Sequence, residues 1–301
     1  MNILKIHEVS KIYANHTALD KVSFDVPKGK IFGLLGPNGA GKTSLIRIIN
    51  QITAPDHGYI HFDGEELNSN HIKRIGYLPE ERGLYKKMQV YDQLLYFARL
   101  KGLNKSKAHQ TIDYWLEKFE ALDWKKKKIE ELSKGMQQKI QFIITVLHQP
   151  DFIILDEPFT GFDPKNTQLI KDEIFGMKEG GKSVMLSTHR MESVEEICDE
   201  VVLINKAKVI RQGQVDSIRH ELKEDLFEVI YDGEHDAGVV EGIELLHQEH
   251  NQGHTTISFK FKDGVAPNIQ NFTDKNIEIK QYRELIPSMQ EVFLKLTEED
   301  A

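Results

Sequence analysis

Cysteine is almost absent from this 301-residue chain, in which Cys198 is the single example. One thiol excludes an internal disulfide and fits a reducing cytosol. Long apolar runs are missing as well, because stretches such as FIIL at 152–155 fall far short of the roughly eighteen residues that a membrane-spanning helix needs. The N-terminal MNILKIHEVSKIY lacks the apolar core and cleavage site of a signal peptide, which favours a cytoplasmic protein. If the protein serves a membrane, another chain must supply the spans.

The chain also lacks an excess of positive charge. Its net charge is −8, so it has no global basic field of the kind that concentrates a protein on nucleic acid or anionic lipid, and we expect no nucleic-acid partner. The basic run Lys125 to Lys128 is typical of a solvated loop. With 40% hydrophobic and 29% charged residues, the composition is that of a globular protein of one large or two smaller domains.

Short apolar runs alternate with helical patterns in the first two thirds of the chain. The runs are IFGLLG at 31–36, FIILD at 152–156, SVMLS at 183–187 and EVVLI at 200–204. Fully apolar strands that alternate with helices predict an α/β fold with a parallel sheet covered on both faces. Residues 88–148 carry helical patterns alone, which predicts a helical insertion in this core.

The pattern changes after about residue 222. Alternating stretches follow, among them LFEVIYDG, TTISFKFKDG and NIEIKQYRE, and the final PSMQEVFLKLT places Met289, Val292, Phe293 and Leu296 on one helical face. We therefore expect a larger α/β domain over 1–222 and a small α+β domain over 223–301.

The string GPNGAGKT at 36–43 has the spacing of a phosphate-binding loop, and it lies between an apolar strand and the helical SLIRIIN. Its glycines let backbone N–H groups point at phosphate oxygens, and the helix N-terminus adds positive potential. Lys42 is expected to pair with the β- and γ-phosphates of ATP, and the Thr43 hydroxyl to bind Mg²⁺. The predicted nucleotide-binding residues are Gly36, Pro37, Asn38, Gly39, Ala40, Gly41, Lys42, Thr43 and Ser44.

Two further strands end in polar residues. After FIIL, Asp156 is expected to hold Mg²⁺, and Glu157 to orient and deprotonate the attacking water; the alternative is that both acids merely end a strand. STH at 187–189 ends another apolar run. The position of His189 at the carboxyl end of a strand favours contact with the γ-phosphate over a structural role.

Two more strings complete a pattern, namely LSKGMQQ at 132–138 and GFDP at 161–164. In their order and spacing with the phosphate loop, LDEP and STH, they make residues 1 to about 218 resemble the ATP-binding subunit of an ABC transporter. The resemblance implies a P-loop NTPase core with a mainly parallel sheet, an antiparallel β subdomain and a helical insertion. It also implies a second ATP-binding subunit, in a homodimer, and an integral membrane permease at the inner face of the membrane.

The same resemblance assigns residues to the dimer. The signature residues Ser133, Lys134, Gly135 and Met136 would act on an ATP held by the second protomer. Ser133 and Gly135, with the N-terminus of the following helix, would grip its γ-phosphate, since Ser is a good helix N-cap and Gly permits close approach. Lys134 and Met136 depart from the usual LSGGQ, and the loss of Gln puts its nucleotide contact in doubt. Asp163 would couple the two sites across the dimer. Tyr13 would stack on adenine, with core packing as the alternative.

The stretch YLPEERGLY at 77–85 places Glu80 where the family usually has Gln. Gln offers a carbonyl oxygen to Mg²⁺, and Glu offers an anionic oxygen to the same ion. Glu81 and Arg82 are interpreted as a solvated pair or a contact to a membrane partner. This form of the stretch resembles bacterial export ATPases with a C-terminal extension. The alternatives are an ABC-type ATPase that acts on nucleic acid or ribosomes, and a nucleotide-binding module that no longer hydrolyses.

Overall fold

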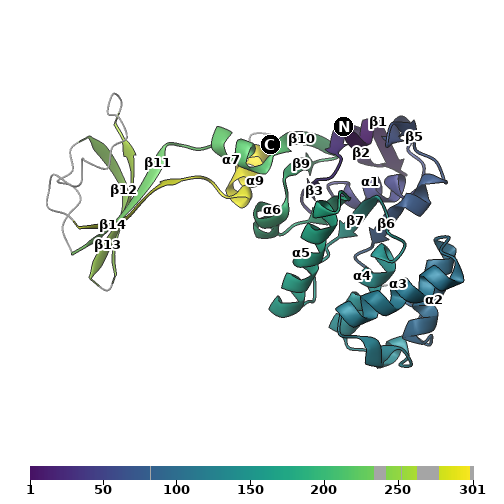
Figure 1. The fold of residues 1–301 in the computed structure, drawn as a ribbon. Coiled ribbons are helices and arrows are strands. Elements are labelled where there is room, and N and C mark those ends of the chain that lie inside the picture. The colour runs from purple at the N-terminus through teal and green to yellow at the C-terminus, as the bar shows by residue number, and fades with distance from the viewer. Residues whose placement is uncertain (82, 234–241, 252, 263–277, 299–301) are drawn as a thin grey trace. The chain divides into compact units, whose positions relative to one another are not determined.

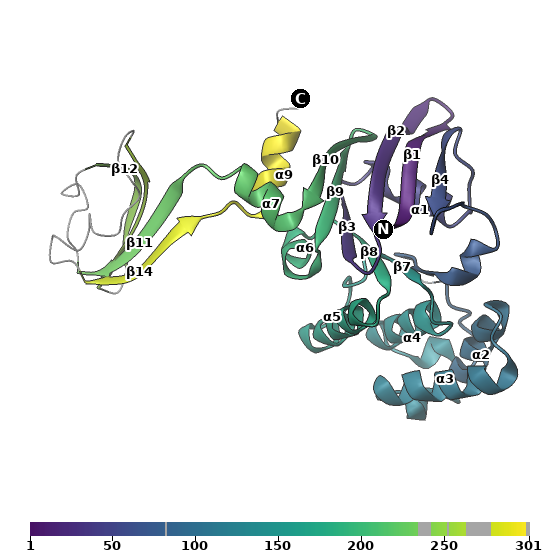
Figure 2. The same ribbon diagram turned by 45° about the horizontal axis from the view of Figure 1, so that its top comes forward.

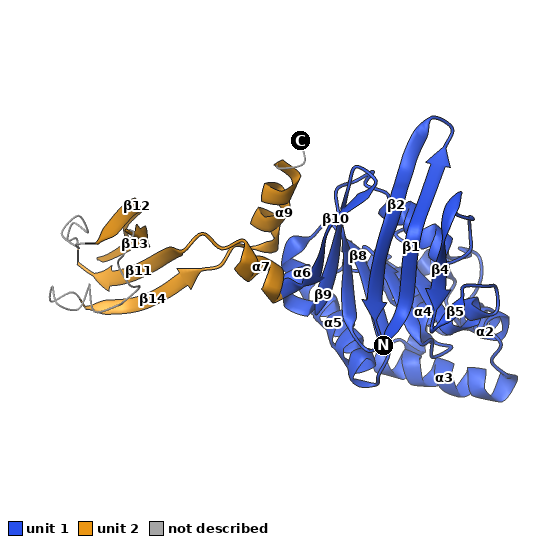
Figure 3. Ribbon diagram, turned by 90° about the horizontal axis from the view of Figure 1, so that it is seen from above, with its two compact units in different colours: residues 1–215, 300–301 blue, residues 216–299 orange. Residues whose placement is uncertain are grey.

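The computed structural model describes residues 1–81, 83–233, 242–251, 253–262 and 278–298. The chain divides into two compact units, residues 1–215 and 216–299 (Figure 3). The sequence placed this boundary at 222. The division comes earlier because helix α7 (Val215–Glu221) lies almost wholly in the second unit, where Arg219 Nε donates to the Pro287 carbonyl at 2.8 Å.

The first unit contains two β-sheets (Figures 1 and 2). The antiparallel sheet has the order β2 (His16–Pro27), β1 (Asn2–Tyr13), β4 (His57–Phe62) and β5 (Glu65–Glu66). The larger sheet has the order β10 (Lys208–Gln214), β9 (Glu200–Asn205), β3 (Ile31–Leu35), β8 (Ser183–Thr188), β7 (Phe152–Asp156) and β6 (Ile75–Leu78). Its strands pair in parallel except for the edge strand β10. The predicted fold class is confirmed.

The core of this unit lies between the two sheets. Every residue of β3 and β7 is buried, as expected for strands covered on both faces. Helix α1 (Lys42–Ile49) contributes Leu45, Ile46 and Ile49 to one hydrophobic cluster with side chains of both sheets. This packing fixes the N-terminus of α1 at the end of β3.

The helical insertion predicted for 88–148 contains three α-helices and two short 3₁₀ turns. They are α2 (Val90–Leu100), α3 (Lys105–Lys118), η2 (Leu122–Trp124), η3 (Ile129–Glu131) and α4 (Lys134–Val146). Trp115, Phe119 and Phe142 pack their rings against one another where α3 meets α4. The remaining helices of this unit are η1 (His71–Arg74), α5 (Pro164–Glu179) and α6 (Met191–Ile197).

The second unit contains an antiparallel sheet of the order β12 (Ile243–Asn251), β13 (His254–Phe261), β11 (Leu226–Asp232) and β14 (Ile279–Leu285). In β11 the apolar residues Phe227, Val229 and Tyr231 are buried, which matches the alternation in the sequence. Helix α9 (Met289–Glu298) buries Met289 and Val292, as predicted. The first two residues of the predicted NIEIKQYRE strand lie outside the described residues. No helix in the described ranges is long and apolar enough to cross a membrane.

Candidate functional site

The loop between β3 and α1 has the shape of a phosphate cradle. Gly36 and Gly41 have φ values of 154° and 110°, and a Cβ atom would stand 2.2 Å from the Ile204 carbonyl oxygen at the first and 2.2 Å from the Ala18 carbonyl oxygen at the second. Only glycine fits either position. Gly41 caps α1 without a side-chain hydrogen bond, and no acid stands in the first turn. The backbone N–H groups of this helix end therefore remain suited to an anion.

Lys42 is the first residue of α1, and its side chain is buried. Its ammonium group donates to the Gly36 carbonyl at 2.6 Å and to the Pro37 carbonyl at 3.1 Å. Burial lowers the pKa of Lys42, and the neighbouring carboxylates, Glu157 first among them, act in the opposite direction. The buried ammonium group and the helix N–H groups could bind the oxygens of a polyphosphate, and its metal ion could bind the neighbouring carboxylates.

One cleft of about 270 Å³ gathers most of the predicted site. The predicted residues that line it are Tyr13, Asn38, Gly39, Gly41, Lys42, Thr43, Ser44, Glu80, Asp156, Glu157 and His189. Gly36, Pro37 and Ala40 complete the loop but do not line the cleft. His16 and Ala18, which sequence reasoning missed, line it as well. They could have been found from the short turn that follows Tyr13, because this turn pairs His16, the first residue of β2, with Tyr13.

Glu157 is held by the loop that follows β8. Its Oε1 accepts from the His189 backbone N–H at 2.9 Å and from His189 Nδ1 at 2.6 Å, and its Oε2 accepts from the Thr188 hydroxyl at 3.2 Å. The backbone of Glu157 has φ 50°, a conformation that is uncommon for a residue other than glycine.

Thr43, Glu80 and Asp156 bring three oxygen donors to the same cleft. Burial raises the pKa of Asp156, and the charges of Glu80 and Glu157 act in the same direction, so a cation would relieve this repulsion. Within the described ranges, no three His, Cys, Asp or Glu side chains lie close enough to hold a metal by themselves. This donor set fits Mg²⁺, which binds one or two carboxylates together with substrate phosphates.

The signature residues do not line this cleft. Ser133 caps α4, where its hydroxyl oxygen accepts from the Met136 N–H at 3.3 Å. A Cβ atom at Gly135 would meet nothing within 4 Å, so this helix end has open space beside it. Lys134 and Met136 belong to the same first turn. The structure therefore presents the signature as a second, separate helix N-terminus.

Asp163 caps helix α5, and its carboxylate accepts from the Asn166 backbone N–H at 2.9 Å. That hydrogen bond lowers the pKa of Asp163.

Glu80 and Glu81 also line a neighbouring cleft of about 670 Å³ with Arg47 and Tyr77. Arg82 lies outside the described residues.

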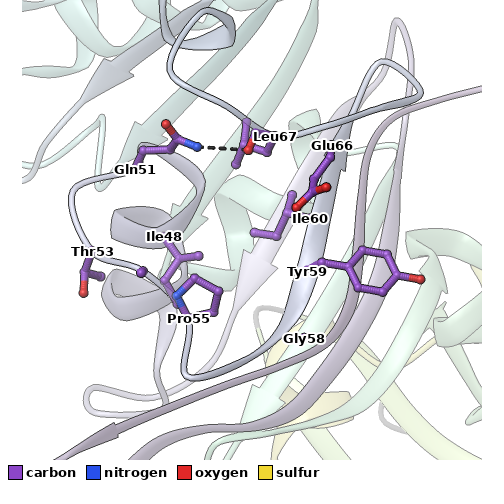
Figure 4. A pocket seen from close by; sticks show the side chains of 10 residues that line it. Ile48, Gln51, Thr53, Pro55, Gly58, Tyr59, Ile60, Glu66 and Leu67 are labelled. Carbon is purple, nitrogen blue, oxygen red and sulfur yellow. Dashed lines mark hydrogen bonds between the residues drawn. The ribbon is translucent and has the colours of Figure 1, made fainter.

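Figure 4 shows another pocket, of about 330 Å³, at the end of α1. Its wall includes Ile48, Pro55 and Ile60, and Gln51 Nε2 donates to the Leu67 carbonyl at 3.0 Å. None of the predicted site residues lines this pocket. The candidate site is therefore the cleft around Lys42.

Comparisons with known proteins identify the family of this chain. Residues 19–160 match the family described as ABC transporter, and residues 213–297 match the family described as ATP-binding protein DrrA1-3-like, C-terminal domain. An uncharacterized ABC transporter ATP-binding protein, YhaQ of Bacillus subtilis, is 48% identical over 217 residues, 72% of this chain and 73% of that protein. A Nod factor export ATP-binding protein of Ralstonia nicotianae is 34% identical over 235 residues, 76% of this chain and 73% of that protein.

The solved structure of an ATP binding subunit of an ABC transporter superposes on this chain with a TM-score of 0.69 at 29% identity. The match covers 73% of this chain and 92% of that one. Fold and cleft together define a nucleotide-binding protein with a phosphate loop. More narrowly, the chain belongs to the family of ABC transporter ATP-binding proteins. The predicted family is confirmed.

Proposed function

We propose that this chain binds MgATP, hydrolyses it to ADP and phosphate, and thereby drives a separate membrane permease. One observation carries the proposal: a single cleft joins the phosphate loop, Glu157 and His189. A nucleotide-binding module without hydrolysis would not need a carboxylate beside the γ-phosphate position. Glu157, held at that place by three hydrogen bonds, supports hydrolysis.

Different residues of the cleft bind different parts of MgATP. Lys42 and the N-terminal N–H groups of α1 hold the phosphates, and Tyr13 stacks on the adenine ring. Thr43, Asp156 and, through its anionic oxygen, Glu80 would hold Mg²⁺, which when bound would supply positive charge to the phosphate oxygens.

Glu157 acts as the general base in this proposal. It orients a water molecule toward the γ-phosphorus and takes one of its protons, a role that contributes about 10²–10⁴-fold to the rate. His189, which contacts Glu157, holds the γ-phosphate. Both side chains come from loops at the carboxyl ends of neighbouring parallel strands, β7 and β8, where ligands of open α/β sheets bind.

A second copy of the chain completes the site. The open helix end at Ser133 and Gly135 lies outside the chain's own cleft, which supports its use on an ATP held by the partner. Lys134 adds positive charge to that helix end, which suits a phosphate. Asp163, the N-cap of α5, couples the two sites from an exposed loop. We propose a head-to-tail homodimer that closes on two ATP molecules and reopens after hydrolysis.

The permease binds beside the loop that carries Glu80. The cleft around Glu81 and Tyr77 adjoins this loop. Tyr85, in the loop before the helical insertion, and Tyr96, on α2, contact each other and are both exposed. Exposed aromatic residues beside a cleft suit a protein partner. The Nod factor export relative supports export as the direction. The protein then lies at the inner face of the membrane, and residues 216–299 form an accessory domain.

Glu157→Gln tests the proposal, because it keeps the size of the side chain and removes the base. This variant binds MgATP and accumulates as a dimer in size-exclusion chromatography, while phosphate release falls at least about 10²-fold. Glu179→Gln, an exposed position at the end of α5, is the control and keeps wild-type turnover. Near-normal turnover of Glu157→Gln would remove the assigned role.

Cell fractionation tests the membrane partner. We expect the protein in the membrane fraction when its permease is present and in the soluble fraction when the permease is deleted. Membrane attachment that survives deletion of the permease contradicts the proposed dependence.

A further inference from the structure

Thr188 is a buried residue in contact with the proposed base. It is the last residue of β8, and its exposed fraction is 1%. The parallel pairing of Asp156 with Ser187 places the end of β7 beside the end of β8, and the Glu157 N–H donates to the Ser187 carbonyl at 2.8 Å. The Thr188 hydroxyl thereby comes within 3.2 Å of Glu157 Oε2.

The direction of this hydrogen bond follows from the other partner of the hydroxyl. The Arg190 backbone N–H donates to Thr188 Oγ1 at 3.1 Å, so one lone pair of this oxygen is used. The hydroxyl has one proton, and an ionised carboxylate can only accept. The proton of Thr188 therefore points at Glu157 Oε2.

The two carboxylate oxygens of Glu157 differ as a result. A carboxylate has about two acceptor positions on each oxygen. Oε1 receives both the backbone N–H and the ring Nδ1 of His189, whereas among the residues that the structure describes Oε2 receives only the Thr188 hydroxyl. The remaining acceptor position of the carboxylate is on Oε2.

We infer that Thr188 is a positioning residue for hydrolysis, which holds the Glu157 carboxylate so that the free position of Oε2 takes the proton of the attacking water. As one O–H bond of the water breaks, its electron pair forms the new bond to the γ-phosphorus and the proton passes to Oε2. The bond from the γ-phosphorus to the bridging oxygen breaks, and its electron pair leaves with ADP. This inference rests on the proposed function, because it assigns no role to Thr188 without Glu157 as base.

Thr188→Val tests it, since valine keeps the shape of threonine and removes the hydroxyl. We expect kcat of the purified full-length protein to fall about tenfold to a hundredfold, the range for a hydrogen bond to a charged group, while KM for ATP stays within about twofold. Thr188→Ser keeps the hydroxyl and restores kcat. Thr111→Val, a buried threonine of α3 outside the cleft, is the matched control and leaves kcat unchanged.

A double variant separates this inference from the proposed function. Thr188→Val added to Glu157→Gln lowers the residual rate no further, because Thr188 acts through the carboxylate. If Glu157→Gln itself turns over normally, the proposed function fails. If Glu157→Gln is inactive while Thr188→Val keeps wild-type kcat, only the inference fails. A Thr188→Ser variant that loses kcat as Thr188→Val does, with a lowered Tm in both, also overturns it, because packing alone then explains the loss.

Discussion

His189 Nδ1 lies 2.6 Å from Glu157 Oε1, and the backbone N–H of His189 reaches the same oxygen. Since an ionised carboxylate only accepts, the Nδ1 atom carries the ring proton. The opposite ring nitrogen, Nε2, is then the atom left for the γ-phosphate. It can donate to a phosphate oxygen when the ring is also protonated there. One side chain thus connects the proposed base to the proposed phosphate position.

The two ring nitrogens can be tested separately by substitution of His189. Asn places its amide nitrogen near the position of Nδ1, whereas Gln reaches toward the position of Nε2. If phosphate contact is the role of His189, both His189→Ala and His189→Asn lose about 10²-fold in kcat, and His189→Gln keeps part of the rate. Single-turnover phosphate release measures this. Equal activity of all three variants would contradict the assignment.

Tyr13 is predicted to bind adenine through its ring face. Its side chain lies in the nucleotide cleft and the residue is 39% exposed, which fits stacking better than core packing. Tyr13→Ala should weaken ATP affinity by about 1–3 kcal/mol, and Tyr13→Phe should change it little, because stacking uses the ring and not the hydroxyl. Titration with a fluorescent ATP analogue measures both. Tyr59→Ala, 43% exposed and outside the cleft, is the control.

The strands and motifs with strong local patterns could be predicted from the sequence. FIILD at 152–156 coincides with β7. In an α/β protein, a short run of apolar residues that ends in an acid is typical of a buried parallel strand. The phosphate loop could be predicted from the spacing of its glycines and Lys42, although the atoms that exclude a side chain at Gly36 and Gly41 belong to Ile204 and Ala18, which are distant in the chain. The pattern that predicts each of these features lies within a few neighbouring residues.

Features that depend on distant residues could not be predicted. Strand β12 has the sequence IELLHQEHN, which lacks alternation because the strand lies at a sheet edge with most of its residues exposed. The contact of Thr188 with Glu157 depends on the register of β7 and β8, which no local pattern reports. The sequence places the domain boundary at 222, whereas the compact units divide after residue 215, because α7 packs with the second unit through a contact to Pro287 that is distant in the chain.

Arg74 is predicted to stabilise the first unit by linking its two sheets. Its guanidinium donates to Asp63, which follows β4, at 2.6 Å and to Asp151, which precedes β7, at 2.7 Å. Because the Arg74 side chain is 40% exposed, solvent screens both pairs, and we expect Arg74→Met to lower the free energy of unfolding by about 1 kcal/mol. Urea denaturation at pH 7 measures this difference. Arg99→Met is the control, because Arg99 is exposed and its guanidinium donates to the nearby Leu103 carbonyl at 2.7 Å, a contact that does not link the two sheets.

The same link should depend on pH. The hydrogen bond from Arg74 lowers the pKa of Asp63 below its ordinary value of 3.8. The carboxylate therefore contributes stability that is fully present above about pH 4 and is lost as the pH falls through the lower, folded-state pKa. The difference between wild type and Arg74→Met should shrink over that acidic range. A difference that stays constant down to pH 3 would show that the link stabilises through packing on Phe62 instead.

Glu80 is predicted to act through Mg²⁺ as an anionic substitute for Gln. It lines the cleft with the carboxylates of Asp156 and Glu157, and these negative charges repel one another unless a cation is bound. Glu80→Gln keeps a carbonyl oxygen and should be tolerated. Glu80→Ala removes the oxygen and should raise the Mg²⁺ concentration that gives half-maximal ATPase activity.

The alternative is that Glu80 contacts the permease and not the metal. In that case the purified protein keeps its wild-type Mg²⁺ dependence in both variants, and only permease-coupled transport falls. Titration of Mg²⁺ at saturating ATP against wild type, Glu80→Gln and Glu80→Ala separates the two. Glu179→Gln, an exposed position at the end of α5 that lines neither cleft, is the control, so its Mg²⁺ dependence should equal that of wild type. Wild-type metal dependence of Glu80→Ala would exclude the metal role, since an oxygen that binds Mg²⁺ cannot be removed without weakening the ion's hold on the site.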